Sequence, residues 1–211
     1  TVRTQKIHRN YLKIRLIIFG TLALALVIAS YFSESLCPYD SYLQDLGNAK
    51  ALPSAAHLFG TDRYGRDMLS RVIAGSKTSI YSTLLLVGFI MVFGTMIGIF
   101  CAWSGKKTDS ILMRISDIFL AFPGLVFALA VAAALGGGVH NAIIALAAIS
   151  WPKYARVARS QTLAQKETVY IRAARLSGCG TRKLILKHIL PNIFGPILVT
   201  AMLDIGTMMM E

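Results

Sequence analysis

The chain has 211 residues, of which 55% are hydrophobic and 15% are charged, and 22 basic residues against 10 acidic ones give it a formal net charge of +12. A mean hydropathy of +0.59 excludes an ordinary soluble domain, in which charged residues are spread along the whole chain. Long runs without charge alternate here with short charged segments, which indicates an all-α, polytopic transmembrane helical bundle.

The charge-free runs predict about five membrane spans. The first run, Leu16–Ser33, contains 18 residues and extends roughly 27 Å as a helix, close to the thickness of the hydrocarbon core. Its basic flank is also typical of a secretory signal, but its length favours an uncleaved anchor. The turn-forming segment Leu135–Asn141 divides the longest run. We therefore expect helices at about 16–33, 79–104, 111–135, 141–160 and 188–210.

The distribution of basic residues predicts the orientation of these spans. With the N-terminus in the cytoplasm, segments 1–15, 106–117 and 153–187 lie inside and carry 17 basic residues against three acidic ones. Segment 34–77 lies outside and carries five of each. The positive-inside rule expects this distribution, so the basic net charge does not by itself indicate nucleic acid.

The segment 153–187 contains nine basic residues. Burying them at the bilayer centre would cost more than roughly 20 kcal/mol, at about 2.5–3.5 kcal/mol each, so we expect the segment to lie outside the membrane. Its pattern predicts a helix within Glu167–Gly178, a turn at Gly178–Gly180 and a second helix from Thr181. A DNA-binding helix-turn-helix and a plain basic loop are alternatives. The small residues of the first helix favour a socket for a partner protein.

The segment at 172–192, RAARLSGCGTRKLILKHILPN, resembles the EAA loop of ATP-binding-cassette importer permeases in the spacing of its Ala-Ala, Gly and Leu-Pro residues. Over about residues 57–211 the chain is similar to the branch of this family that imports peptides and nickel. Two features depart from the family pattern. Arg172 stands where the motif usually has Glu, and the chain ends at Glu211 where the family continues, so we expect the final span to be missing. The segments that carry the similarity are His57–Ile80, Met113–Leu125 and His188–Asn192.

The resemblance implies a type I importer permease, with a core at 77–211 that follows a tail, an anchor and an external loop at 1–76. It implies alternating access, driven by a separate ATPase that contacts the loop at 168–183. The implied partners are a homologous second permease subunit, two ATPases, an extracytoplasmic binding protein and membrane lipid. ATP and Mg²⁺ would be bound by the ATPases, so this chain is expected to hold no cofactor and to be a transporter subunit, not an enzyme. The implied location is the bacterial inner membrane, multi-pass, with a cytoplasmic N-terminus. The residues implied in coupling are Arg172, Ala173, Ala174, Gly178, Cys179, Gly180, His188, Leu190 and Pro191.

Motifs of other functional classes are absent from the sequence. It has no G-x-x-x-x-G-K-[ST], H-E-x-x-H or G-x-S-x-G motif, so it predicts neither ATP binding nor a metalloprotease or serine hydrolase. Cys37, Cys101 and Cys179 are far apart and indicate neither a zinc site nor a disulfide framework. A membrane enzyme would need a catalytic dyad. A membrane-anchored nucleic-acid regulator, the more remote alternative, would need 153–187 to bind DNA with a steep salt dependence.

Two groups of residues outside the loop are candidates for packing or docking. Gly94 and Gly98 form a G-x-x-x-G pattern, which predicts close helix packing within this subunit or against a sister permease. The stretch Gly60–Asp67 alternates turn residues with charges, which predicts local salt bridges, or a gate or docking surface for a binding protein. The candidate residues in this stretch are Gly60, Asp62, Gly65, Arg66 and Asp67.

Asp204 lies well inside an apolar stretch, which indicates a structural partner or a place in the translocation path, for which Met208 is a second candidate. The run Met208–Met210 suggests a soft-metal site. However, three consecutive residues point in different directions around a helix, so we expect apolar packing and predict no metal site. The LDIG segment followed by methionines is more similar to the nickel permeases of the branch. Nickel or a nickel chelate is therefore favoured weakly as the substrate, with dipeptides or oligopeptides as the alternative.

Overall fold

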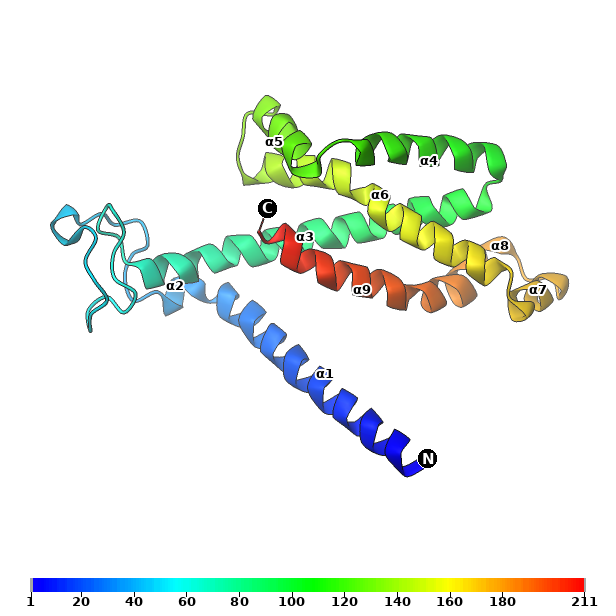
Figure 1. Ribbon diagram of the computed structural model, residues 1–211, viewed down its shortest axis with the longest axis horizontal. Helices are drawn as coiled ribbons and strands as arrows, with labels where there is room; N and C mark the ends of the chain where they lie inside the picture. The colour runs from blue at the N-terminus through cyan, green and yellow to red at the C-terminus, as the bar shows by residue number, and fades with distance from the viewer. Residues whose placement is uncertain (1, 211) are drawn as a thin grey trace. The chain divides into compact units, whose positions relative to one another are not determined.

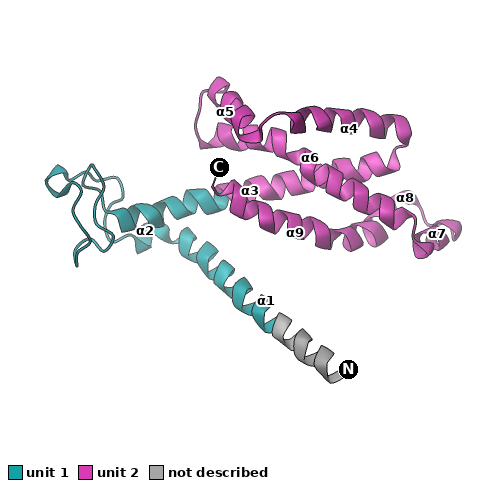
Figure 2. Ribbon diagram, in the orientation of Figure 1, with its two compact units in different colours: residues 1–81 teal, residues 82–211 magenta. Residues whose placement is uncertain are grey.

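The structure, a computed structural model, describes the backbone of residues 2–210 and the side chains of residues 13–210. The basic side chains before Lys13 and the carboxylate of Glu211, which contribute to the predicted charge distribution, lie outside the described residues. The described backbone is mostly helical, apart from a loop at 37–67 that contains one short helical turn. That loop has one isolated antiparallel bridge between Thr61 and Asp67. It forms two compact units, residues 1–81 and residues 82–211 (Figure 2).

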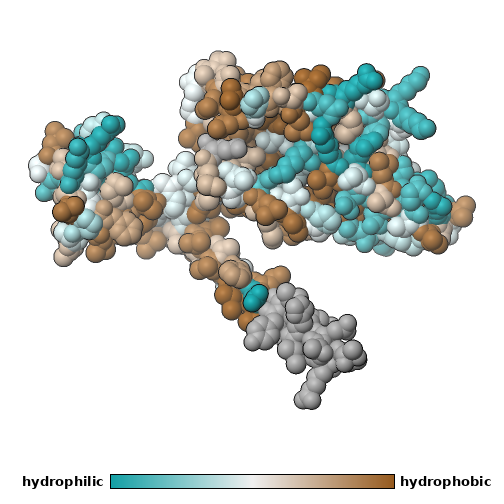
Figure 3. All heavy atoms as spheres, in the orientation of Figure 1, coloured by the Kyte–Doolittle hydropathy of each residue, from teal (hydrophilic) through white to brown (hydrophobic). Residues whose placement is uncertain are grey.

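The first unit contains one long helix, a folded loop and the start of a second long helix. Its elements are α1 (Val2–Tyr31), α2 (Ser33–Leu36), η1 (Leu46–Asn48) and the first part of α3 (Met68–Trp103). The apolar side chains of α1 are mostly exposed, and the described part of this helix is hydrophobic on the face seen in Figure 3. A helix that is apolar all round is typical of a membrane span.

The second unit consists of the rest of α3 and the helices that follow it (Figure 1). Short elements connect three long helices that run alongside one another. The elements after α3 are α4 (Lys106–Ala121), α5 (Gly124–Ala134), α6 (Val139–Lys166), α7 (Val169–Leu176), α8 (Thr181–Leu184), the π-helical turn η2 (Ile185–Ile189) and α9 (Leu190–Met208).

α3, α6 and α9 share one apolar core. Its buried side chains include Ile90 of α3, Tyr154 of α6 and Ile193 of α9. A smaller apolar cluster joins α5 to the first half of α6 through Ala128 and Ala145. Since apolar side chains gain no hydrophobic free energy from moving out of lipid, close packing of this kind holds membrane helices together.

Gly94 and Gly98 place α3 directly against the backbone of α6. A Cβ atom at Gly94 would lie 2.6 Å from the carbonyl oxygen of Trp151, and one at Gly98 would lie 2.3 Å from that of Ala155. Only glycine leaves room for this approach. The G-x-x-x-G pattern therefore packs helices inside this subunit.

The predicted helix 111–135 is wrong in one respect, because the chain breaks there into two helices. α4 ends at Ala121 and α5 begins at Gly124, with an angle of 89° between them. Phe122, at the break, has an extended conformation with ψ 145°. The proline at 123 causes this, because its ring disfavours the helical conformation in the residue before it.

Two other predicted boundaries also differ from the structure. α3 begins at Met68, well before the predicted start at 79, and α6 continues to Lys166 instead of ending at 160. The segment 153–187 is therefore not one loop, since its first part completes α6. Three of the described helices are long and apolar enough to cross a membrane, or four if α4 and α5 form one bent span. We predicted five; α6 is not among them, and basic residues occupy its second half.

Candidate functional site

The short helix α7 is the centre of the predicted coupling loop. Its one buried side chain, Ile171, is fully buried in the apolar core of the second unit. Leu176, near its other end, is 90% exposed. After α7, Gly178 has φ +79° and the N–H of Cys179 bonds to the carbonyl of Ala174 at 3.1 Å, an end typical of a glycine-terminated helix. One face of α7 is thus anchored and the other is open.

The structure brings the predicted coupling residues together around this helix. Ala173 is exposed on α7, and Ala174 beside it is half-buried. Cys179 packs against the apolar core, and Gly180 immediately precedes α8. The last three predicted residues are His188 at the end of η2 and Leu190 and Pro191 at the start of α9.

Arg172, which departs from the family pattern, forms an ion pair with Glu167. Glu167 lies just before α7, and both side chains are mostly exposed. An exposed ion pair contributes about 0–1 kcal/mol. The loop therefore has a carboxylate, that of Glu167. It lies five positions before the position at which the family motif usually has Glu.

Tyr170 joins the start of α7 to the start of α9. Its hydroxyl accepts a hydrogen bond from the side-chain amide of Asn192 at 2.9 Å, and the same amide donates to the carbonyl of His188 at 2.6 Å. Sequence reasoning missed both Tyr170 and Asn192 as functional candidates. Asn192 belongs to a segment that carries the family resemblance, which was the available signal.

Three basic residues of α6 each pair with an acidic residue of another helix. Lys153 pairs with Asp204 of α9. Arg156 and Arg159 follow at three-residue spacing along α6 and pair with α4. Arg156 pairs with Asp117, and Arg159 pairs with Asp109. The free-energy cost that the sequence predicts for burying segment 153–187 did not include these acidic partners. Ionisable residues within membrane bundles are normally paired in this way.

Asp204 is buried, with 2% of its surface exposed, between α9 and α6. Its Oδ1 pairs with Lys153, whose side chain is 53% exposed. Its Oδ2 and the buried hydroxyl of Tyr154 have no hydrogen-bond partner among the described residues. Met208, the other predicted path residue, packs against the apolar core instead. Asp204 therefore has a structural partner, and Lys153 presents a half-exposed ammonium group beside it.

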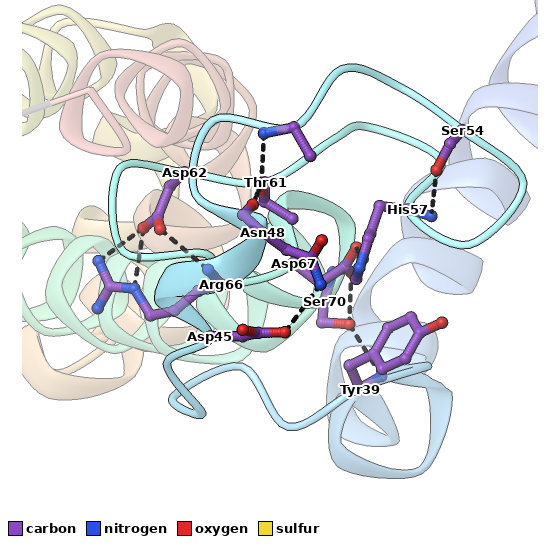
Figure 4. Close-up of polar contacts among 11 residues, drawn as sticks. Tyr39, Asp45, Asn48, Ser54, His57, Thr61, Asp62, Arg66, Asp67 and Ser70 are labelled. Carbon is purple, nitrogen blue, oxygen red and sulfur yellow. Dashed lines mark hydrogen bonds and ion pairs between the residues drawn. The ribbon is translucent and has the colours of Figure 1, made fainter.

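In the first unit, the stretch Gly60–Asp67 folds into a network of polar contacts, drawn in Figure 4. Asp62 accepts hydrogen bonds from Nε of Arg66 at 2.8 Å and from the N–H of Tyr64 at 2.8 Å. Asp67 contacts Nδ1 of His57 at 3.0 Å and accepts from the hydroxyl of Ser70 at 2.7 Å. Sequence reasoning predicted local salt bridges in this stretch but not the participation of His57 and Ser70.

The pKa values of the two carboxyl groups in this network are lowered. Burial by itself raises the pKa of Asp62, but hydrogen bonds from Arg66 and from backbone N–H groups outweigh burial and hold that pKa well below its usual value. Burial also raises the pKa of Asp67, and hydrogen bonds from Ser70 and His57 reverse that effect and lower it. Both groups are therefore carboxylates at neutral pH.

Two glycines of this stretch are required by its geometry. Gly65 has φ +75°, and a Cβ there would lie 1.6 Å from the carbonyl oxygen of Asp45. Gly60 has φ +70°, and a Cβ there would lie 2.5 Å from that of Ala51. A side chain is disfavoured at such backbone angles as well as excluded by these contacts. The described residues contain no group of three His, Cys, Asp or Glu side chains that could hold a metal ion.

Comparison with known proteins relates the chain to membrane transport components. Residues 94–211 match the family described as binding-protein-dependent transport system inner membrane component. The chain is 41% identical over 182 residues to a probable D,D-dipeptide transport system permease protein of Escherichia coli (strain K12), covering 86% of this chain and 61% of that protein. It is 36% identical over 200 residues to a dipeptide transport system permease protein of Alkalihalophilus pseudofirmus, covering 94% and 66%.

A third relative is a glutathione transport system permease protein of Pectobacterium atrosepticum, 35% identical over 189 residues and covering 89% of this chain and 62% of that protein. The chain thus spans about three fifths to two thirds of the length of these relatives. All three are transport permeases and not enzymes, and none is named for nickel.

Proposed function

Because this chain belongs to the family of binding-protein-dependent transport system inner membrane components, we propose that the protein is a permease subunit of an ATP-driven importer of small peptides. The observation that carries the proposal is the relationship to permeases named for D,D-dipeptide, dipeptide and glutathione transport. All of these names denote short peptides, so they favour the peptide alternative over nickel. Met208 is packed in the core while Met210 is exposed, so the methionine run gives nickel no common site.

The proposed importer contains further subunits. A homologous permease would complete the path, two ATPases would bind ATP and Mg²⁺, and an extracytoplasmic binding protein would deliver the substrate. We propose that the chain lies in the bacterial inner membrane with its N-terminus and α7 in the cytoplasm. For α7, Figure 3 supports this proposal, because many hydrophilic side chains gather over the end of the second unit that carries α7 and the start of α4.

The open face of α7 is the proposed contact with the ATPase. It is suited to this because Ile171 holds the helix to the core while Ala173 and Leu176 remain exposed. The small side chain of Ala173 lets a partner surface approach the backbone. ATP must favour one arrangement of the ATPases over another for this contact to do work on the permease.

Movement of α7 has a route into the bundle along α9. The hydrogen bond between Tyr170 and Asn192 joins α7 to the start of α9, and Asp204 lies near the other end of that helix. Asp204 holds Lys153 of α6. In the proposed alternating-access cycle, this pair of a buried carboxylate and a half-exposed lysine belongs to the path or to the helix contact that opens it.

The loop that precedes α3 is the proposed contact on the opposite side of the membrane. Asp62 and Asp67 hold its fold through the contacts described above, so the stretch Gly60–Asp67 is rigid. A rigid surface suits the docking of a binding protein, because little conformational freedom is lost when the partner binds.

Substitution of Ala173 by Trp tests the proposed function. In the full protein, assembled with its ATPase and binding protein in liposomes, we expect the indole to block the contact with the ATPase. Uptake of a labelled dipeptide and substrate-stimulated ATP hydrolysis should both fall about tenfold or more, the equivalent of losing roughly 1.4 kcal/mol of binding. Nickel ions in excess should not compete for uptake in the unsubstituted protein.

Ala164→Trp is the matched control, because Ala164 is also exposed but lies on α6 outside α7. That variant should transport normally. Normal ATP hydrolysis and dipeptide uptake in Ala173→Trp would contradict the coupling role of α7, and uptake that follows nickel instead of the dipeptide would contradict the substrate class.

A further inference from the structure

The indole ring of Trp103, the last residue of α3, lies against two cations from different helices. Nζ of Lys166, the last residue of α6, is 5.0 Å from the ring centroid. Cζ of Arg175, in the last turn of α7, is 5.1 Å from it. Both distances are within the roughly 6 Å over which an aromatic ring attracts a cation. One ring therefore joins the ends of three helices.

A hydrogen bond strengthens this contact. Nζ of Lys166 donates to the carbonyl of Ala102 at 2.6 Å. The last carbonyl groups of a helix have no partner within it and carry partial negative charge, so they favour a nearby cation. Among the described side chains, no carboxylate forms an ion pair with Lys166 or Arg175. The hydrogen bond of Lys166 and the ring contacts of both cations are thus directed at the end of α3.

α7 is connected to the long helices at two ends. Tyr170 in its first turn bonds to Asn192 at the start of α9, and Arg175 in its last turn contacts Trp103 of α3. Ile171 lies between them and enters the core. If α7 moves, the contact at Tyr170 acts on α9, and the contact of Arg175 with Trp103 acts on α3.

We infer that Trp103 is a positioning residue that makes this end of α3 follow α7 during the transport cycle. A displacement of α7 by a few ångströms must either carry Trp103 along or separate the ring from Arg175, because the attraction is short-ranged. Lys166 holds the ring to α6 while this happens. The motion of α7 then reaches α3 through Trp103 and α9 through Tyr170. The inference rests on the proposed function of α7 as the contact with the ATPase.

Two substitutions of Trp103 separate its ring from its apolar volume. Trp103→Phe keeps an aromatic face, and Trp103→Leu keeps an apolar side chain without one. In the full protein assembled with its ATPase and binding protein in liposomes, we expect Trp103→Leu to import about fivefold less dipeptide per ATP hydrolysed. A loss of this size corresponds to the free energy of one or two contacts between a cation and an aromatic ring. ATPase association should be unchanged, and Trp103→Phe should stay within about twofold of the unsubstituted protein.

Phe100→Leu is the matched control, because Phe100 lies one turn earlier on α3, is exposed and has no cation over its ring among the described contacts. It should leave the uptake per ATP unchanged. Arg175→Gln should also lower the uptake per ATP, because it removes the contact between α7 and the ring. The double variant should be no worse than Trp103→Leu, which already lacks that contact. Additive losses would overturn the inference.

A distance measurement completes the test. Spin labels at position 104 and at position 177, the exposed end of α7, in a protein without its native cysteines, should keep their separation when ATP is added if α3 follows α7. In Trp103→Leu that separation should change with ATP, and an unchanged separation there would overturn the inference. If the spectrum of a single label at position 177 does not change with ATP in the protein that keeps Trp103, the proposed function fails and the inference with it. If that spectrum changes but Trp103→Leu imports normally, the role of Trp103 alone fails.

Discussion

Among the glycines of the described residues, Gly65 has the least room for a side chain. Its positive φ and the 1.6 Å from its built Cβ to Asp45 mean that even alanine requires the loop to open. Strain at such a position costs on the order of 1–3 kcal/mol, and the steric overlap adds to it. The fold of the loop before α3 therefore depends on glycine at this position as well as on its ion pairs.

We predict that Gly65→Ala loosens this loop without disturbing the second unit. Protease cleavage between residues 37 and 67 should be accelerated at least several-fold relative to the unsubstituted protein. Gly75→Ala is the control, because nothing lies within 4 Å of a Cβ at that position. Equal cleavage of the two variants would show that Gly65 is not needed for the fold of the loop.

At the scale of elements, an ion pair with the buried carboxylate of Asp204 joins α9 to α6. Asp204 is almost fully buried and its recorded ionic partner is Lys153. Breaking a fully buried pair by removing one partner costs about 3–5 kcal/mol. The exposure of Lys153 lowers this cost, because its ammonium can turn toward solvent when the carboxylate is lost.

Asp204→Asn should therefore destabilise the protein by about 2 kcal/mol, measured as a lower thermal unfolding temperature in detergent. The double variant Lys153→Met with Asp204→Asn should recover part of the loss, because it removes the unpaired charge. Asp117→Asn, at the more exposed pair with Arg156, is the control and should change the unfolding temperature little. An unchanged unfolding temperature in Asp204→Asn would mean that the pair does not hold α6 to α9.

The loop before α3 should be sensitive to acid. Asp62 and Asp67 have folded-state pKa values below the usual 3.8. A carboxyl group lowered in this way stabilises the folded loop above its unfolded pKa, and this contribution is lost as the pH falls toward the folded pKa. We expect protection of 37–67 from hydrogen exchange to be constant down to about pH 5 and to fall below about pH 4, after correction for intrinsic exchange.

Asp62→Asn should make the fall in protection smaller, because the amide does not take up a proton in this pH range while Asp67 still does. The exposed acid Asp40 of the same loop offers the matched variant Asp40→Asn, which should retain the profile of the unsubstituted protein. A profile unchanged by Asp62→Asn would assign the acid response to other groups.

At the scale of the whole chain, the basic residues have two roles. The excess of basic residues predicts the orientation of the spans, and within the second unit three of these residues hold helices together. Lys153, Arg156 and Arg159 occupy positions three apart on α6, so they lie along one side of it. Their partners on α4 and α9 are 39 to 51 positions away in the sequence.

The family and the helical class could be predicted because their causes are local. A bilayer requires long charge-free helices, and these are visible as runs in the sequence; the Ala-Ala, Gly and Leu-Pro spacing likewise lies within one segment. Helix ends were less predictable. Proline at 123 was visible, but whether a proline bends a helix or merely weakens it depends on what packs against the next segment.

The amino-acid sequence by itself thus determined a polytopic helical permease and predicted a coupling segment around residues 168–183. Only the tertiary structure decided which acid pairs with which base, that α4 and α5 meet at 89°, and that Trp103 and Tyr170 connect α7 to two different long helices. The physical reason is distance along the chain. Helix formation depends on neighbours within about four positions, whereas these contacts join residues that become neighbours only after the helices have packed.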